Sequence, residues 1–180
     1  MSTRTLRRPA ALAAVVALGL SATLAAQPRE RRSPHETVKG TIDGAQLTIE
    51  YGRPYMKGRQ VEGGLIPYDR VWRTGADEAT TLTTDKALKI GDANVPAGKY
   101  TLYTQASEGE WKLVINKQTG QWGTVYDEKQ DLARVPMTKK ALSEPLEQFT
   151  ISIDDGAGAG GTIKLAWNKT EASAPVTVQN

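Results

Sequence analysis

The sequence predicts an all-β fold, and three observations carry this prediction. Apolar and polar residues alternate along several short runs, as in residues 47–51 and 149–153, which places one side of each run on a buried face. Turn signals such as Asp43-Gly44 recur at close spacing between these runs. No long stretch shows the 3.6-residue periodicity of an amphipathic helix. We therefore expect a two-sheet β-sandwich that is jelly-roll-like, with a small β-barrel as the alternative.

The expected strands follow one another with short connections. Residues 38–42 and 47–51 form a hairpin across Asp43-Gly44, and residues 100–105 and 111–116 form a central hairpin. Residues 138–144 are expected to form one helical turn that Pro145 ends. A long loop, 52–64, carries several large basic and aromatic side chains, which is typical of a functional loop. The remaining expected strands are 71–74, 79–84, 87–90, 124–126, 131–137, 149–153, 163–167 and 174–178.

The first residues have the pattern of an export signal. Arg4, Arg7 and Arg8 form a basic start, residues 10–20 are apolar, and residues 23–26 supply small side chains for cleavage. The apolar run is short for a membrane anchor, which needs about 20 residues. We expect residues 1–26 to be a signal peptide, residues 27–36 a flexible arm and residues 37–180 a single domain. The protein is then exported, to the periplasm or the extracellular medium.

The net charge and the cysteine content limit the kinds of partner and metal site that the protein can have. The whole chain has 23 Lys and Arg and 20 Asp and Glu, and three of the arginines lie in residues 1–26. Taking these 3 from 23 leaves 20 basic residues against 20 acidic ones, so the mature chain is neutral overall. A neutral chain gives no reason to expect nucleic acid as a partner. The absence of cysteine excludes disulfides and thiolate metal sites, and no later apolar run is long enough to cross a membrane.

A charged stretch, residues 66–79, is the centre of the predicted site. It places Arg73 beside Trp72 and follows it with Asp77 and Glu78. One interpretation is a buried salt-bridge network that ties the long loop to the sheet. The other is a pocket for an anionic or polar ligand, with Asp77 or Glu78 as orienting group or general base. The candidate ligand-binding residues are Arg53, Tyr55, Lys57, Arg59, Tyr68, Arg73, Asp77, Glu78 and Trp122.

The tryptophans, the histidine and the carboxylates offer further possibilities for ligand or metal binding. Trp122 lies in a glycine-flanked turn and is the best candidate for an exposed platform, whereas Trp111 and Trp167 are expected in the core. His35 is the single histidine and is expected to be solvated in the arm. A hard-cation site at Asp77, Glu78 and Glu62 lacks the spaced Asp/Asn ladder of calcium loops. We therefore predict no metal and no cofactor.

Several motifs resemble the bacterial domain-of-unknown-function family 2911, and the block around Trp72 to Ala79 is the most specific of them. The resemblance covers nearly all of the mature chain. It implies an exported protein with an all-β domain, and it carries no established activity and no catalytic residue. The motifs are Ser33-Pro34, Ile49-Glu50-Tyr51-Gly52-Arg53-Pro54, Lys57-Gly58-Arg59, Leu65-Ile66-Pro67-Tyr68, Val71-Trp72-Arg73-Thr74-Gly75-Ala76-Asp77-Glu78-Ala79-Thr80, Pro96-Ala97-Gly98-Lys99-Tyr100, Asn116-Lys117 and Gln121-Trp122-Gly123.

Three functions remain open at this point. The first is a binding module for a small polar or anionic ligand, or a glycan. The second is a hydrolase or isomerase that uses Asp77 or Glu78 as acid or base. The third is a structural envelope protein whose charged residues only hold the fold. A sandwich fold can host all three, so the site has to decide.

Overall fold

The computed structural model describes residues 32–156, 158 and 160–179. The predicted signal peptide and residues 27–31 of the predicted arm lie outside these described residues. The last two residues of that arm, His35 and Glu36, instead begin the first strand. Within the described part of the chain, no helix is long and apolar enough to cross a membrane.

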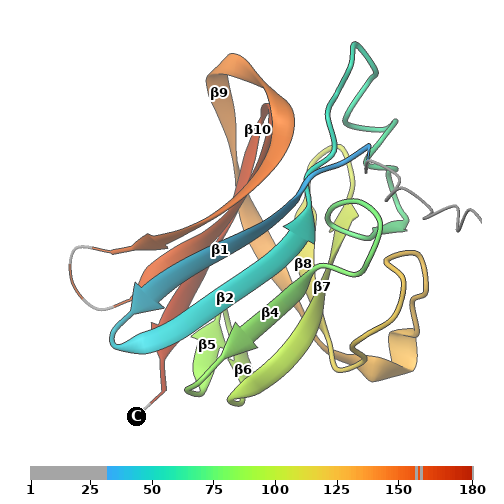
Figure 1. Ribbon diagram of the computed structural model, residues 1–180. Coiled ribbons are helices and arrows are strands. Elements are labelled where there is room, and N and C mark those ends of the chain that lie inside the picture. The colour runs from blue at the N-terminus through green and yellow to red at the C-terminus, as the bar shows by residue number, and fades with distance from the viewer. Residues whose placement is uncertain (1–31, 157, 159, 180) are drawn as a thin grey trace, which may run out of the picture. The chain divides into compact units, whose positions relative to one another are not determined.

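The fold is all-β, as predicted, with ten strands and one short 3-10 helix, η1 (Glu128–Gln130), among the described residues (Figure 1). The strands form one antiparallel sheet in the order β1-β2-β4-β7-β8-β9-β10-β5-β6, with β3 paired to β7. Because this order starts at β1 and ends at β6, the sheet stays open, which excludes the alternative of a closed barrel. The strands are β1 (His35–Ile42), β2 (Ala45–Gly52), β3 (Val71–Trp72), β4 (Thr81–Thr84), β5 (Leu88–Ile90), β6 (Ala93–Val95), β7 (Gly98–Ala106), β8 (Trp111–Asn116), β9 (Asp131–Asp155) and β10 (Gly161–Val178).

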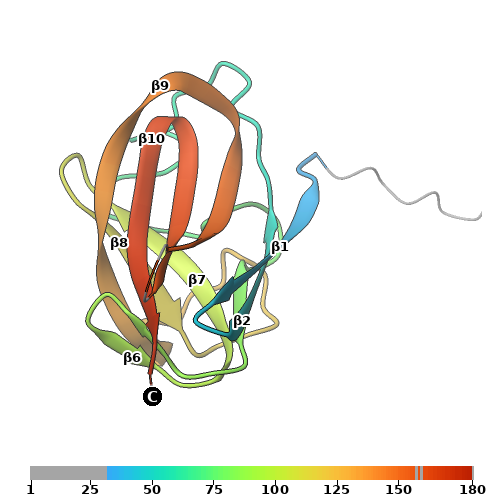
Figure 2. The ribbon, with the colours of Figure 1, turned by 90° about the vertical axis from the view of Figure 1, so that its left-hand side faces the viewer.

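The long strand β9 turns this single sheet into two packed layers. Its first residues pair with β8, and its later residues pair with β10. Figure 2 shows β9 bowing around β10, with β1 and β2 at the lower right. The two layers touch at Gly40 of β1, where an added Cβ would lie 2.5 Å from Ile153 Cγ2 of β9. Buried apolar side chains from both layers form the core between them, among them Ile49, Leu102, Leu113, Ile151 and Leu165.

Most expected strands are present, and the hairpin at Asp43-Gly44 is confirmed. Residues 35–42 and 45–52 pair in register across it. Asp43 (φ 46°) and Gly44 (φ 74°) both have positive φ, as a two-residue type I′ turn requires.

Two local predictions were wrong. Residues 138–144 belong to β9 and form no helical turn, because residues 138–141 pair with β10. Pro145 is tolerated in this strand because the pairing with β10 skips from Ala141 to Leu146, so its missing N–H removes no ladder hydrogen bond. Residues 124–126 form no strand. The Tyr126 hydroxyl donates to Asp131 at 2.6 Å, which holds the segment as a loop against the start of β9.

Candidate functional site

A cavity of about 360 Å³ lies between the segments 54–59 and 72–77. Four cationic side chains line it, and among the described lining residues Asp77 supplies the one carboxylate. A local excess of positive charge around one hollow attracts anions. The lining residues are Arg32, Ser33, Pro54, Tyr55, Lys57, Arg59, Leu65, Trp72, Arg73, Gly75, Ala76, Asp77 and Trp167.

One wall of this basic cavity is the start of the predicted long loop, and β9 holds it in place. The N–H of Met56 donates to the carbonyl of Glu147 at 2.8 Å, and the N–H of Phe149 donates to that of Pro54 at 3.0 Å. The N–H of Lys57 donates to the Glu147 carboxylate at 2.7 Å. These bonds fix the backbone of the loop, so its side chains project from a defined wall.

Arg59 is positioned on this wall without losing its charge. Its Nε donates to the carbonyl of Met56 at 3.0 Å, and its Nη2 donates to that of Tyr55 at 2.7 Å. Both acceptors are neutral carbonyls, so they orient the guanidinium and leave its positive charge uncompensated within the described residues. A guanidinium that is already oriented loses less side-chain entropy when an anion binds it.

The opposite wall is the segment 73–79, whose backbone is strained. Thr74 (φ 53°), Gly75 (φ 154°) and Asp77 (φ 63°) all have positive φ. Buried contacts maintain this shape: Thr74 Oγ1 lies 2.7 Å from Thr104 Oγ1, and Thr80 Oγ1 donates to the Thr74 carbonyl at 2.7 Å. Strained backbone held by its surroundings is typical of functional sites.

Arg73 projects from this strained wall. Its stem lies over Gly123, where an added Cβ would be 2.9 Å from Arg73 Cδ. The side chain is half-buried. Among the described residues, no hydrogen bond or ion pair involves its guanidinium. The salt-bridge network that the sequence suggested between Arg73 and Asp77 or Glu78 is therefore not formed in this part of the chain.

Two tryptophans form the floor of the cavity. Trp72 and Trp167 stack with ring centroids 5.9 Å apart and an interplanar angle of 23°. Trp167 donates from Nε1 to the Glu147 carbonyl at 3.1 Å. Trp167 is buried, as predicted for a core residue, yet both tryptophans also line the cavity. The floor therefore offers apolar ring surface beneath a basic rim.

The structure brings five of the nine predicted site residues to this cavity. They are Tyr55, Lys57, Arg59, Arg73 and Asp77. Four others lie outside its lining: Arg53, Tyr68, Glu78 and Trp122.

All three nitrogens of the Arg53 guanidinium bond to residues of other strands. Its Nε donates to the Phe149 carbonyl at 3.1 Å, its Nη2 donates to Thr150 Oγ1 at 2.8 Å, and its Nη1 pairs with the Glu36 carboxylate. These partners belong to β9 and β1, so Arg53 joins the end of β2 to both of them.

The other three residues outside the cavity have different surroundings. Burial raises the pKa of Tyr68, and the nearby carboxylates of Glu62 and Glu108 raise this pKa further. Trp122, the candidate for an exposed platform, has 49% of its surface accessible. Glu78 lines a neighbouring hollow of about 330 Å³ together with His35.

His35 was expected to be solvated in a flexible arm, but it lies against the two carboxylates of the charged stretch. Its Nε2 is 2.9 Å from Glu78 Oε2 and 4.0 Å from Asp77 Oδ2. Glu62, the third carboxylate considered for a cation site, lies elsewhere: it pairs with Lys139 at 3.2 Å and bonds to Thr170. His35 thus takes the place beside Asp77 and Glu78 that the sequence analysis gave to Glu62.

Sequence reasoning missed several lining residues: Arg32, Ser33, Leu65, Trp72 and Trp167. Trp72 belongs to the stretch 66–79, and its position next to Arg73 in the sequence could have identified it as a site residue. Arg32 and Trp167 lie far from that stretch in sequence, and only the folded chain brings them to the cavity.

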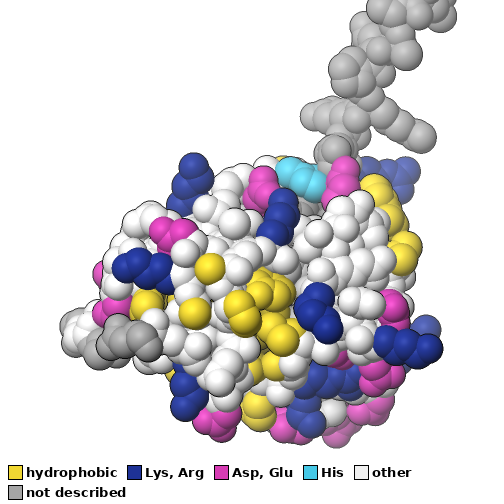
Figure 3. All heavy atoms as spheres, turned by 90° about the horizontal axis from the view of Figure 1, so that it is seen from below, with side chains coloured by type: hydrophobic (Ala, Val, Ile, Leu, Met, Phe, Trp, Pro, Cys, Tyr) yellow, Lys and Arg dark blue, Asp and Glu magenta, His cyan; other side chains and the backbone are white. Residues whose placement is uncertain are grey.

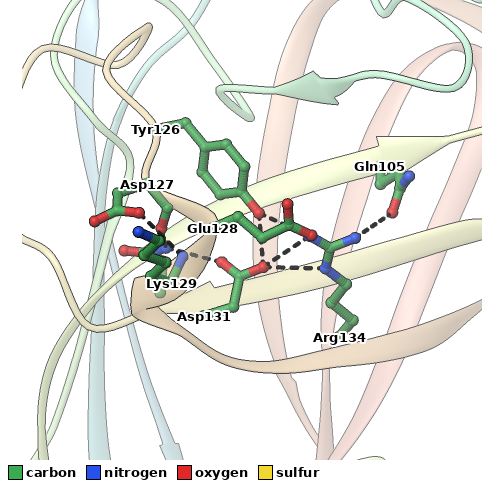
Figure 4. A network of polar contacts seen from close by, with 8 residues as sticks. Gln105, Tyr126, Asp127, Glu128, Lys129, Asp131 and Arg134 are labelled. Carbon is green, nitrogen blue, oxygen red and sulfur yellow. Dashed lines mark hydrogen bonds and ion pairs between the residues drawn. The ribbon is translucent and has the colours of Figure 1, made fainter.

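A second polar cluster surrounds Arg134 at the start of β9 (Figure 4). Its Nε donates to Asp131 at 3.0 Å, its Nη1 to Gln105 at 3.1 Å, and its Nη2 to the Tyr126 hydroxyl at 2.9 Å. Nη2 also pairs with Glu128 at 2.6 Å. All three nitrogens of this guanidinium have partners within the protein, and Arg134 does not line the basic cavity.

The fold and the cavity define an all-β protein with a basic, tryptophan-floored hollow. The chain matches the family model described as "Protein of unknown function (DUF2911)" over residues 33–176. The protein therefore belongs to the DUF2911 family, which confirms the resemblance drawn from its motifs. The comparisons with curated proteins and with solved structures found no match.

Proposed function

We propose that the protein binds a small anionic ligand in the basic cavity. One observation carries the proposal: four cationic side chains surround the hollow with one carboxylate among them. Within the described residues, moreover, the Arg73 guanidinium has no protein partner. Placing an uncompensated guanidinium in a half-buried position costs free energy, and a bound carboxylate or phosphate would offset that cost through paired hydrogen bonds.

The dimensions and floor of the cavity support a particular ligand class. A volume of about 360 Å³ is in the range of pockets for small molecules, about 300–1,000 Å³. Trp72, which is 8% exposed, and Trp167, which is 3% exposed, add a small apolar area to the lining, against which a short carbon skeleton can rest. We therefore propose an organic anion, either a carboxylated or a phosphorylated small molecule, rather than a bare inorganic ion.

An acid/base enzyme is the second candidate, and the contact between His35 and Glu78 favours it. Their 2.9 Å separation is within the reach of a hydrogen bond between an acid and a base. Asp77 lies beside this pair and also lines the basic cavity. An anionic substrate bound there would have a carboxylate and an imidazole close at hand. A ligand that the protein converts, with conversion lost in Glu78→Gln, would support this candidate over simple binding.

The structural-protein hypothesis is less well supported. In that hypothesis the charged residues only hold the fold, which requires them to pair with each other and gives a cavity no role. The described residues contain the cavity, and Glu78 contacts His35. We further propose that the protein acts outside the cytoplasm, in the periplasm or the medium, because residues 1–26 have the pattern of an export signal.

The test is thermal unfolding of the full chain with a panel of probes: inorganic phosphate, citrate, galacturonate and adenosine monophosphate, with glucose as the neutral comparison. At about 100 times the dissociation constant, a ligand adds about 2.7 kcal/mol, which raises the midpoint by about 5 °C or more. A midpoint raised by galacturonate or citrate would identify a carboxylate site. A midpoint raised by adenosine monophosphate would identify a phosphate site. Inorganic phosphate acting as strongly as the organic anions would point to a simple ion site.

The variant pair Arg73→Gln and Arg70→Gln gives the control. Each removes one arginine, but Arg70 is exposed and does not line the basic cavity. We expect the anion-induced rise to disappear in Arg73→Gln and to persist in Arg70→Gln. The proposal fails if no anion raises the midpoint. It also fails if both variants lose the rise equally, because Arg70 and Arg73 together line a separate hollow of about 420 Å³ and an equal loss would place the anion there or indicate charge screening.

A further inference from the structure

We propose a second site on this protein: a divalent-metal site formed by His35, Asp77 and Glu78. One nitrogen of the imidazole and one oxygen of each carboxylate all lie within 4.8 Å of one another. An ion placed between them can be approached by all three groups after small side-chain rotations. Metal–ligand distances at such sites are about 2.0–2.2 Å, which a triangle of this size accommodates.

The backbone brings the two ligand segments together at Gly52. His35 is the first residue of β1, and its register partner on β2 is Gly52. The segment 73–79 passes directly over the same glycine: an added Cβ on Gly52 would lie 2.3 Å from the Ala76 carbonyl oxygen. Glycine is therefore required there, since any larger residue would push the segment 73–79 away from the end of β2. This close approach places Asp77 and Glu78 beside His35.

The carboxylate segment is also anchored from its other side. The N–H of Gly123 donates to the Asp77 carbonyl at 3.0 Å, and Glu78 forms a β-bridge with Trp122. The Glu78 and Asp77 side chains are thus carried by a backbone that is hydrogen-bonded to a neighbouring loop. A site built on fixed backbone requires little ordering when the ion binds.

The donor set indicates the class of metal. One imidazole and two carboxylates suit zinc and other first-row divalent ions such as manganese. Calcium and magnesium prefer sites made of oxygen alone. Three protein ligands leave a further coordination position for water or a ligand, as in catalytic zinc sites.

The three candidate metal ligands are accessible to solvent, and the two carboxylates among them attract a cation. The side chains of His35, Asp77 and Glu78 are 34%, 32% and 44% exposed. Figure 3 shows the single histidine at the surface with acidic side chains beside it. Two neighbouring carboxylates repel each other, and a bound cation would remove that repulsion.

Metal binding is separate from the anion proposal. Asp77 lines the basic cavity, whereas His35 and Glu78 line the neighbouring hollow, so the ion would lie where the two meet. The experiment uses the metal alone, so it can succeed or fail whatever the anion panel shows.

The first test is nuclear magnetic resonance of the full chain, prepared without a histidine tag and titrated with zinc chloride. Because the sequence contains one histidine, the imidazole signals need no assignment. We expect the His35 ring signals to shift and to saturate at one equivalent of zinc. Ring signals that stay unmoved while zinc is added overturn the proposal. This test needs no variant, so it stands even if a substitution impairs folding.

The second test is calorimetric titration of zinc chloride into four variants. Because changes that only support a metal ligand already cost about 10–100-fold in affinity, we expect at least that loss in His35→Gln, Asp77→Asn and Glu78→Gln. Asp92→Asn is the matched control, since Asp92 is an exposed carboxylate in the turn between β5 and β6. It should change the affinity by less than about twofold. Equal affinities in all four variants would show that zinc binds elsewhere.

Discussion

Arg73 and Arg134 differ in one respect that separates a binding residue from a structural one. Both are partly buried arginines. Arg134 directs its donors to Asp131, Gln105, Tyr126 and Glu128 (Figure 4). Arg73 lines a cavity and has no hydrogen bond or ion pair within the described residues. A guanidinium with its own partners stabilises the fold, whereas one facing a cavity without them is available to a ligand.

Arg53 shows that this distinction cannot be read from composition. Arg53 lies in the same loop, residues 52–64, as Arg59, yet its guanidinium already donates to Phe149, Thr150 and Glu36. Arg53 therefore resembles Arg134 in role. Among the predicted basic site residues, only Lys57, Arg59 and Arg73 line the basic cavity.

Breaking the Arg134 cluster should give the largest effect on stability. Asp131 accepts hydrogen bonds from Arg134 Nε, from the Tyr126 hydroxyl and from Asn116 Nδ2 at 2.8 Å. Asp131→Ala leaves these donors without their acceptor, and removing one partner of a buried pair costs about 3–5 kcal/mol. Because Arg134 is 30% exposed, we expect about 3 kcal/mol from the low end of this range.

Urea unfolding measures this loss, with Asp92→Ala as the exposed control. The control should change the free energy of unfolding by less than about 0.5 kcal/mol. A loss below about 1 kcal/mol in Asp131→Ala would show that the cluster is not structural, and the contrast with Arg73 would then fail.

A smaller effect, dependent on pH, is expected at Tyr126. Burial and the hydrogen bond to Asp131 raise the pKa of Tyr126 to about 12, compared with about 10 for a free tyrosine. The folded state thus holds the phenol proton more tightly than the unfolded state. This contribution is present below about pH 10 and is lost as the pH rises through about 12.

The variant Tyr126→Phe isolates this contribution. At neutral pH we expect a loss of about 1 kcal/mol from the missing hydroxyl hydrogen bonds. Between about pH 10 and 12, the wild-type protein should lose more stability than the variant. Buried tyrosines that both proteins share and that do not contact Tyr126, such as Tyr51 and Tyr100, cancel in this difference. Parallel stability curves for the two proteins would contradict the role given to the phenol.

The fold could be predicted to a large extent because it depends on local patterns. Alternation of apolar residues identified the strand around Ile151, and Asp43-Gly44 identified its hairpin. The course of β9 could not be predicted, because residues 138–144 have no strong strand pattern and become a strand through pairing with β10. The segment 124–126 was mistaken for a strand because the bond from Tyr126 to Asp131 is a tertiary contact.

The site could be predicted only in part, for a related reason. The stretch 66–79 and the loop 52–64, which the sequence suggests as parts of one site, both supply lining residues of one cavity. Which charges pair depends on long-range contacts: His35 reaches Glu78 only because β1 lies beside Gly52. The sequence shows which residues carry charge, but only the fold determines which of those charges have a partner of opposite charge.

The most direct test of this account compares Arg73→Gln with Arg134→Gln in thermal unfolding, with and without the panel anion that gives the largest shift. Without anion, we expect Arg73→Gln to change the free energy of unfolding by less than about 0.5 kcal/mol and Arg134→Gln to lower the midpoint by several degrees. With anion, Arg134→Gln should show the full wild-type rise and Arg73→Gln should show none. A rise that survives in Arg73→Gln, or that is lost in Arg134→Gln, would contradict the account.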